Sequence, residues 1–146
     1  MSSPAVRPAC PLCAESGGIL LVDDGRCRVV LVEGAEGAAF PGFCQVIWNS
    51  HVREISDLAA ADRQHLFAWL VATEQAVRAL SAADKINLAS FGNRVPHLHW
   101  HVIPRWEDDS HFPEAIWAAP GRPPPNRPPI PAEALRNKLK TLLQLG

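Results

Sequence analysis

Short apolar runs bounded by turn-forming residues dominate the first fifty positions and return after position 84. The runs GILLVDD and CRVVLVE are separated by an Asp- and Gly-containing turn, which is typical of a β-hairpin, and FCQVIWN follows the turn-like FPG. Two later runs, KINLASF and HLHWHVIPR, are joined by a segment that contains Gly92 and Asn93. We therefore predict five strands, in residues 18–24, 27–33, 43–49, 85–91 and 97–105.

The hydrophobic period changes between the third and fourth of these strands. Buried-type residues recur there every three or four positions, as on one face of a helix, at Leu66, Leu70, Thr73, Val77 and Leu80. This period predicts one long amphipathic helix over residues 60–80. A helix between two sets of antiparallel strands predicts an α+β domain with an antiparallel sheet.

The last forty residues have a different character. Residues 120–131 contain seven of the 14 prolines, so this Pro-rich segment is expected to run extended over a surface. Residues 132–145 then predict a helix in which Leu135, Leu139 and Leu142 share a face that must pack on a partner. We interpret residues 1–146 as a single domain, with a core of about 10–106 and a C-terminal extension of 107–146.

Composition excludes several classes of protein. Apolar residues make up 47% of the 146 positions and the formal net charge is −1, as in an ordinary globular protein and unlike one that binds nucleic acid or a membrane through bulk charge. No apolar stretch approaches the roughly 18 residues that span a bilayer, and the N-terminus lacks the pattern of an export signal. We therefore expect a cytoplasmic protein with no nucleic-acid or membrane partner, whose four cysteines are thiols or metal ligands.

Three histidines alternate with apolar residues in the last predicted strand. His97, His99 and His101 would share one face of that strand, with neighbouring Cα atoms roughly 6.6 Å apart. Imidazoles so spaced can bind a catalytic metal, or one of them can attack phosphorus while its neighbours orient it and handle charge. The spacing alone leaves both chemistries open.

The segment HLHWHVI resembles the pattern His-φ-His-φ-His-φ-φ, where φ is apolar, of the histidine triad (HIT) superfamily of nucleotide hydrolases and transferases. The resemblance extends over about residues 10–105, since VIWNSHVREISDL and NLASFGNRVPHLHWHVIPR also look like the segments that precede the triad. It implies that His99 is the nucleophile, that His101 hydrogen-bonds the phosphate and leaving group, and that His97 orients the nucleophile.

Four further positions are candidates for substrate binding by the same resemblance. Asn87 and Asn93 match phosphate-side amides, although both also fit as turn residues. Glu33 lies where an Asp commonly binds the ribose hydroxyls, or it is a solvated charge at a strand end. Arg94 departs from the family, replacing a small hydroxyl residue in a loop one residue shorter than in many members; its fork of donors would clamp a second phosphate or point into solvent.

The N-terminal CPLC raises the question of a second metal site. Some family members hold a structural zinc through such a CxxC, the histidine after the third strand and the first triad histidine. Here those positions are Cys10, Cys13, His51 and His97, a Cys2His2 set of the kind that closes a tetrahedral zinc site. The resemblance implies this structural Zn²⁺ and no organic cofactor.

The sequence therefore predicts an enzyme, similar to diadenosine polyphosphate hydrolases, that binds a purine nucleotide. It would transfer or hydrolyse a nucleoside monophosphate from a dinucleoside polyphosphate or a nucleoside phosphoramidate through a nucleotidylated His99. The alternatives are an HxHxH metalloenzyme and a non-catalytic nucleotide-binding protein on the same scaffold. Family members pair by extending one sheet, so we expect a homodimer. Residues 106–117 are interpreted as a packed surface loop or dimer contact, the alternative being a cover over the nucleotide.

Overall fold

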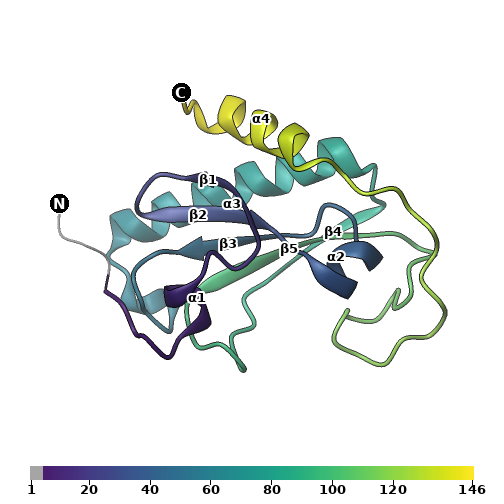
Figure 1. Cartoon of the computed structure of the whole chain (residues 1–146), viewed down its shortest axis with the longest axis horizontal. Coiled ribbons are helices and arrows are strands. Elements are labelled where there is room, and N and C mark those ends of the chain that lie inside the picture. Colours follow the sequence, from purple (N-terminus) through teal and green to yellow (C-terminus); the bar gives the residue numbers. More distant parts are fainter. Residues whose placement is uncertain (1–4) are drawn as a thin grey trace.

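The computed structural model describes residues 5–146, which form one open sheet flanked by helices (Figure 1). All neighbouring strands are antiparallel and their spatial order is β1-β2-β3-β5-β4. The bounds are β1 Ile19–Asp23, β2 Cys27–Leu31, β3 Cys44–Trp48, β4 Lys85–Ala89 and β5 His99–Arg105. The predicted α+β class, the five strands and the hairpin between the first two are thus confirmed.

The last strand begins later than its sequence pattern indicates. β5 starts at His99, whereas the alternation of residue types predicts a start at His97. Pro96 has no N–H to give to a ladder, and the N–H of His97 turns back to the carbonyl of Val95 at 2.8 Å. Pairing resumes at Leu98, whose N–H donates to the carbonyl of Val52. His97 therefore lies in a bend at the entrance of the strand.

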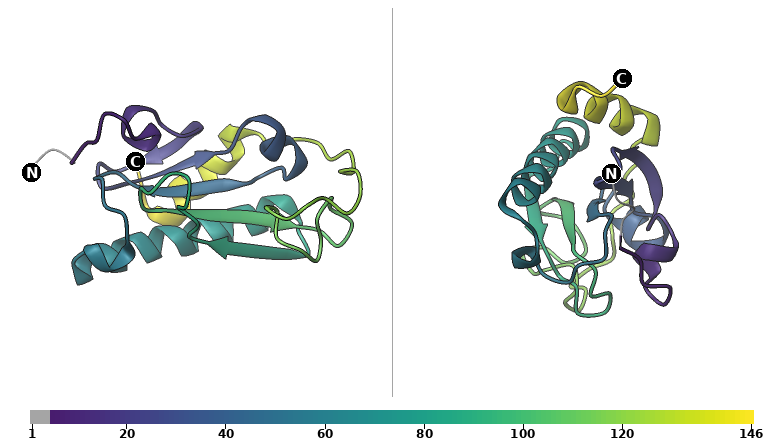
Figure 2. Two further views of the ribbon diagram at one scale, coloured as in Figure 1. Left: turned by 90° about the horizontal axis from the view of Figure 1, so that it is seen from below. Right: turned by 90° about the vertical axis from the view of Figure 1, so that its left-hand side faces the viewer.

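Two helices cover one face of the sheet. α3, Ala60–Ser81, carries the predicted apolar face, and α4, Ala132–Leu143, lies beside it (Figure 2). Leu135 and Leu139 of α4 are fully buried in the main core, together with Leu66 and Val77 of α3. The apolar face of the C-terminal helix therefore packs on α3 and β1 of its own chain. That face needs no second subunit as its partner.

The opposite face of the sheet carries short elements and loops. α1, Pro11–Ala14, lies there (Figure 2), and α2, Gly34–Ala39, follows β2. These elements and the 3-10 turn η1, Ile55–Asp57, are too short to produce a hydrophobic period, and the sequence pattern did not predict them. The long loop after β5 runs around the end of the molecule away from the N-terminus (Figure 1).

The two edges of the sheet differ. At the β1 edge, Arg136 of α4 donates to the backbone carbonyls of Leu20 at 2.8 Å and Leu21 at 3.2 Å. At the other edge, β4 pairs only with β5 among the described strands. Over the part of the chain that the structure describes, no helix is both long enough and apolar enough to span a membrane.

Candidate active site

The second and third histidines lie on the sheet face opposite α3. The register pairs His99 with Ile47 of β3 and His101 with Gln45, so these four side chains share that face. The alternate residues Trp100 and Val102 point to α3 instead. His99 and His101 are only 6% and 7% exposed. The sheet thus places two adjacent imidazoles side by side, both largely shielded from solvent.

One hydrogen bond decides which nitrogen of His99 can react. Its Nδ1 lies 2.5 Å from the carbonyl oxygen of His97, an acceptor, so Nδ1 carries the proton and donates. In the neutral ring, Nε2 then keeps its lone pair. The main chain of the first triad residue therefore fixes the orientation and tautomer of the second, and leaves it one defined nitrogen with a lone pair.

His101 has the opposite tautomer because of its cross-strand neighbour. The Nδ1 atom of His101 lies 3.3 Å from the amide nitrogen of Gln45, which donates to it. The proton of neutral His101 is then on Nε2, a buried atom that makes no well-formed hydrogen bond among the described residues, although the backbone of Phe91 lies near enough to favour the protonated ring slightly. An N–H donor at this position beside His99 is suited to an oxygen that gains charge during a reaction.

Burial keeps all three imidazoles neutral. Desolvation lowers the pKa of His97 and of His99 below the usual value near 6.5. Desolvation, helped by the neighbouring His99, lowers the pKa of His101 to about 4. At neutral pH the face therefore offers one lone pair and one N–H donor with no positive charge on either ring.

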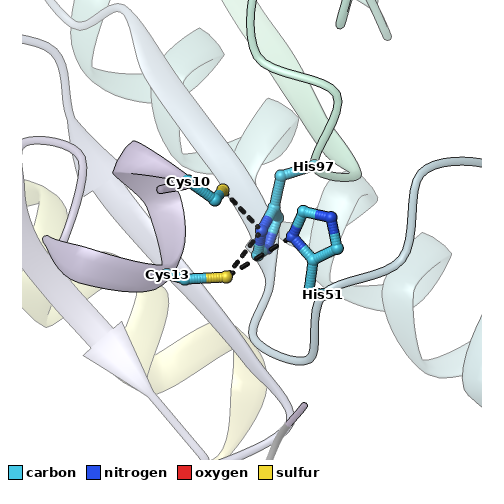
Figure 3. A group of neighbouring side chains, drawn as sticks. All are labelled: Cys10, Cys13, His51 and His97. Atoms are coloured by element: carbon cyan, nitrogen blue, oxygen red, sulfur yellow. Dashed lines mark hydrogen bonds between the residues drawn. The ribbon is translucent and has the colours of Figure 1, made fainter. Parts of the chain in front are cut away.

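His97 turns toward the N-terminal segment (Figure 3). Its Nε2 donates to the carbonyl of Trp48 at 2.6 Å, which leaves the lone pair on Nδ1. This Nδ1 lies 3.4 Å from Sγ of Cys10 and 3.5 Å from Sγ of Cys13, and Nδ1 of His51 lies 3.4 Å from the same Cys13 sulfur. Three segments far apart in sequence thus bring four metal-ligating atoms together.

This cluster can hold a metal ion. Its four ligand atoms all lie within 4.8 Å of one another. A tetrahedral zinc ion bonded to sulfur and nitrogen at ordinary lengths requires sulfur–nitrogen edges of about 3.6 Å, close to the separations between Cys10, Cys13 and the two histidines. Within residues 5–146 it is the only such group, and neither His99 nor His101 belongs to it. The three triad imidazoles do not converge on one point, which disfavours the HxHxH metalloenzyme.

A polar cavity of about 400 Å³ opens beside His99 and His97. Asn93 lines it, as does Arg53, a cation that the sequence reasoning did not single out. Arg94 is exposed and is not among its lining residues. The structure therefore brings Asn93, but not Arg94, to the wall of the cavity at His99.

The other two candidates for substrate binding lie elsewhere. Asn87 is on the histidine face, opposite Ile103, and its Oδ1 accepts a hydrogen bond from Arg105 at 2.8 Å. Glu33 is exposed and occupies the N-cap position of α2, two residues after the end of β2, without a side-chain capping bond. Neither side chain lines the cavity at His99.

A buried ion pair at the end of β5 was not predicted from the sequence. Arg105, which is 2% exposed, donates through Nε and Nη2 to the carboxylate of Asp109, at 2.8 and 3.1 Å. Asp109 also accepts the backbone N–H groups of Trp106, His111 and Phe112. Burial opposes ionisation, but Arg105 and these amides outweigh it and lower the pKa of Asp109 to about 2. The pair fixes the loop that follows β5.

A five-stranded antiparallel sheet with alternating histidines opposite its long helix defines a histidine triad protein, and the chain belongs to the HIT family, whose domain model matches residues 18–108. Among curated proteins it is similar to two called AP-4-A phosphorylase from strains of Mycobacterium tuberculosis, with 31% identity over 81 residues. The match covers 49% of this chain and 40% of theirs, so the chain spans less than half the length of these relatives.

Solved structures agree with the family and the fold. A histidine triad protein from Marinobacter aquaeolei VT8 is 28% identical with a TM-score of 0.67, over 90% of this chain and 93% of that chain. Another, from Sinorhizobium meliloti 1021, is 25% identical with a TM-score of 0.64, over 90% and 91%. A third, from Bradyrhizobium japonicum, is 24% identical with a TM-score of 0.66, over 88% and 90%, and supports the fold alone.

Proposed function

We propose that the protein is a nucleotidyl hydrolase or transferase that forms a covalent nucleotidyl-histidine intermediate at His99. The observation that carries this proposal is the hydrogen bond from Nδ1 of His99 to the His97 carbonyl, which leaves Nε2 free to attack. The lowered pKa of His99 keeps that nitrogen unprotonated at neutral pH. A non-catalytic binding protein would have no need of a nucleophile held in one tautomer.

The reaction follows from the two tautomers. Nε2 of His99 bonds to the α-phosphorus of the nucleotide, and the bond to the leaving group breaks with its electron pair going to that group. Nε2–H of His101 stabilises the developing charge, as its unpartnered position on the face permits. Water, or a second acceptor, then attacks the adduct, releases the nucleoside monophosphate and regenerates neutral His99.

We propose a dinucleoside polyphosphate or a nucleoside phosphoramidate, with a purine base, as the substrate. Membership of the HIT family and the similarity to an AP-4-A phosphorylase support this class. The cavity beside His99 supplies Asn93 and Arg53 as donors to phosphate oxygens. Asn87 and Glu33 remain proposals for phosphate and ribose, and Arg94 for a second phosphate.

Chemical quenching tests the intermediate. Brief mixing with substrate followed by alkali is expected to leave a nucleoside monophosphate on His99 through an acid-labile bond, since protonation makes imidazole a good leaving group. His99→Ala should abolish both adduct and turnover. His101→Ala should slow adduct formation by about 10²-fold while nucleotide binding persists. Undiminished turnover in His99→Ala would refute the proposal.

We further propose that the cluster of Cys10, Cys13, His51 and His97 binds a structural zinc ion. The separations of its ligand atoms and the donation of His97 Nε2 to Trp48 support it, because a ligating histidine usually donates its second nitrogen to a carbonyl. Zinc there would fasten the N-terminal segment to the start of β5 and would supply no step of the chemistry.

Finally, we propose a homodimer joined along β4. Exposed apolar side chains gather on the helix side of this edge: Phe67 and Val71 of α3 are 41% and 53% exposed, and Leu88 of β4 is 44% exposed. Sedimentation should give about twice the chain mass of 15.9 kDa, and Val71→Glu should shift the equilibrium to monomer. A wild-type monomer at micromolar concentration would contradict the proposal.

A further inference from the structure

An exposed pair of aromatic rings lies beside the third histidine. The rings of Phe91 and Trp117 stack with centroids 4.8 Å apart and planes 16° apart. Trp117 also meets the ring of His101 edge-on, at a centroid distance of 5.0 Å. Yet Phe91 and Trp117 remain 45% and 41% exposed. Apolar ring surface therefore faces solvent next to a reacting group, where a bound molecule could cover it.

The chain holds Trp117 in place although its ring is exposed. The preceding residue, Ile116, is buried with Phe43 in a cluster on the histidine face. The far end of the loop is tied by Arg122, whose Nη1 donates to the carbonyl of Asp109 at 2.6 Å. A ring that is already immobilised loses little freedom when a ligand stacks on it. The pair is therefore built as a wall of the site.

The direction of the reaction places the leaving group on this wall. In a phosphoryl or nucleotidyl transfer the attacking and leaving atoms lie in line on opposite sides of phosphorus. The polar cavity with Asn93 lies at His99, the attacking side. His101, which would donate to the leaving side, lies between His99 and the indole of Trp117. Whatever departs from phosphorus therefore leaves toward the aromatic pair.

We propose that Phe91 and Trp117 form a leaving-group subsite that selects a planar aromatic group attached within a few bonds of phosphorus. The ring centroids of Trp117 and His101 are 5.0 Å apart. The indole can therefore contact an aromatic amine bonded directly to the phosphorus more readily than a base at the far end of a polyphosphate. The inference rests on the proposed function and narrows its substrate to nucleoside 5′-phosphoramidates of aromatic amines.

The covalent step balances without a further co-reactant. The phosphorus–nitrogen bond is replaced by a bond from phosphorus to Nε2 of His99. The amine nitrogen keeps the electron pair and takes one proton from water, and hydrolysis of the adduct returns that proton. Because the amine has departed before hydrolysis, a subsite for the leaving group acts on adduct formation alone.

Three substrates that differ only in the amine test the subsite: adenosine 5′-phosphoramidates of 2-phenylethylamine, of 2-cyclohexylethylamine and of ammonia. Comparing each variant with wild type cancels the intrinsic reactivity of each substrate. Trp117→Ala should lower kcat/KM for the phenylethyl compound by about 10-fold or more, with a smaller loss for the cyclohexyl compound and the smallest loss for the unsubstituted one. Trp117→Phe should restore most of the loss, and the rate of adduct hydrolysis should not change.

The outcomes separate this inference from the proposed function. The subsite would be overturned if Trp117→Ala lost no activity, or lost the same factor in kcat/KM for all three substrates. It would also be overturned if adduct hydrolysis slowed or the oligomeric state changed in this variant. Absence of any adduct on wild-type His99 would overturn the proposed function itself. Phe91→Ala repeats the comparison from the other ring and should show the same order of losses.

Discussion

Removing the carboxylate of Asp109 should lower the free energy of unfolding far more than removing the carboxylate of the adjacent Asp108. Asp109 is fully buried and accepts five hydrogen bonds, two from the guanidinium of Arg105 and three from backbone N–H groups. In Asp109→Ala the guanidinium, itself 2% exposed, would remain as a buried charge without its counter-ion. The perturbation is therefore an unpaired charge together with unsatisfied amides, and only in small part a lost volume.

The expected magnitude follows from that burial. Deleting one partner of a buried ion pair costs about 3–5 kcal/mol, a large share of a total stability of about 5–15 kcal/mol. Asp108 supplies a matched control, because it is the adjacent aspartate and pairs with Arg127 while its side chain is 67% exposed. Asp108→Ala should cost at most about 1 kcal/mol.

Urea unfolding followed by tryptophan fluorescence measures both variants, since the chain has five tryptophans. With a slope of about 2 kcal/mol per molar urea, Asp109→Ala should lower the midpoint by about 2 M. Asp108→Ala should lower it by at most about 0.5 M. Equal midpoints for the two variants would refute the reasoning that the buried pair is energetically coupled. In the double variant Arg105→Leu/Asp109→Leu part of the loss should be recovered, because no charge is left buried.

Three shorter predictions concern the histidine face. Burial lowers the pKa of His101 to about 4, so as the pH falls this histidine is protonated in the unfolded chain before it is protonated in the folded one. Between pH 6.5 and pH 4 the wild type should therefore lose up to about 3 kcal/mol more stability than His101→Gln. Parallel pH profiles of the two proteins in urea titrations would contradict this. Purified protein should contain about one zinc per chain by elemental analysis; Cys13→Ser should lose the zinc together with thermal stability, whereas Cys44→Ala, a core control, should keep it. Gln45→Leu, which removes the donor to His101 Nδ1, should slow adduct formation about 10-fold without weakening nucleotide binding, and an unchanged rate in rapid-quench experiments would show that Gln45 does not position His101.

The framework of the fold was predictable because local patterns encode it. Val22, Val29 and Val46 alternate with residues of the opposite face, and the buried positions of α3 recur from Leu66 to Val77, over about three turns. Such signals depend on neighbours within a few positions. The same locality explains why the predicted start of β5 was too early, since the alternation includes His97 although Pro96 interrupts the ladder.

The inner arrangement of the site depends on register between distant segments, which no local pattern records. The pairing of Gln45 with His101 requires β3 and β5 to be aligned to the residue. Arg105 and Asp109 read as ordinary charges until the loop after β5 folds back over them. Likewise, an aromatic loop residue such as Trp117 gains its meaning only from its contact with His101. The cysteine and histidine set was reached through family resemblance, and the structure supports that assignment by bringing its atoms together.

The hydrogen bonds from Arg136 to the carbonyls of β1 bear on how many chains can assemble through the sheet. An open sheet can grow by strand addition at either end, and growth at both ends gives a fibre. Here the guanidinium of Arg136 on the C-terminal helix binds two carbonyls of β1, those of Leu20 and Leu21, so a strand added at this edge would have to displace a charged side chain. Among the described strands this leaves β4 for strand addition, and in the proposed homodimer two chains paired along β4 about a two-fold axis would cover each other's open edge. Arg136→Ala, which keeps the buried leucines of α4 in the core, would free these carbonyls and leave both edges of the sheet open to strand addition.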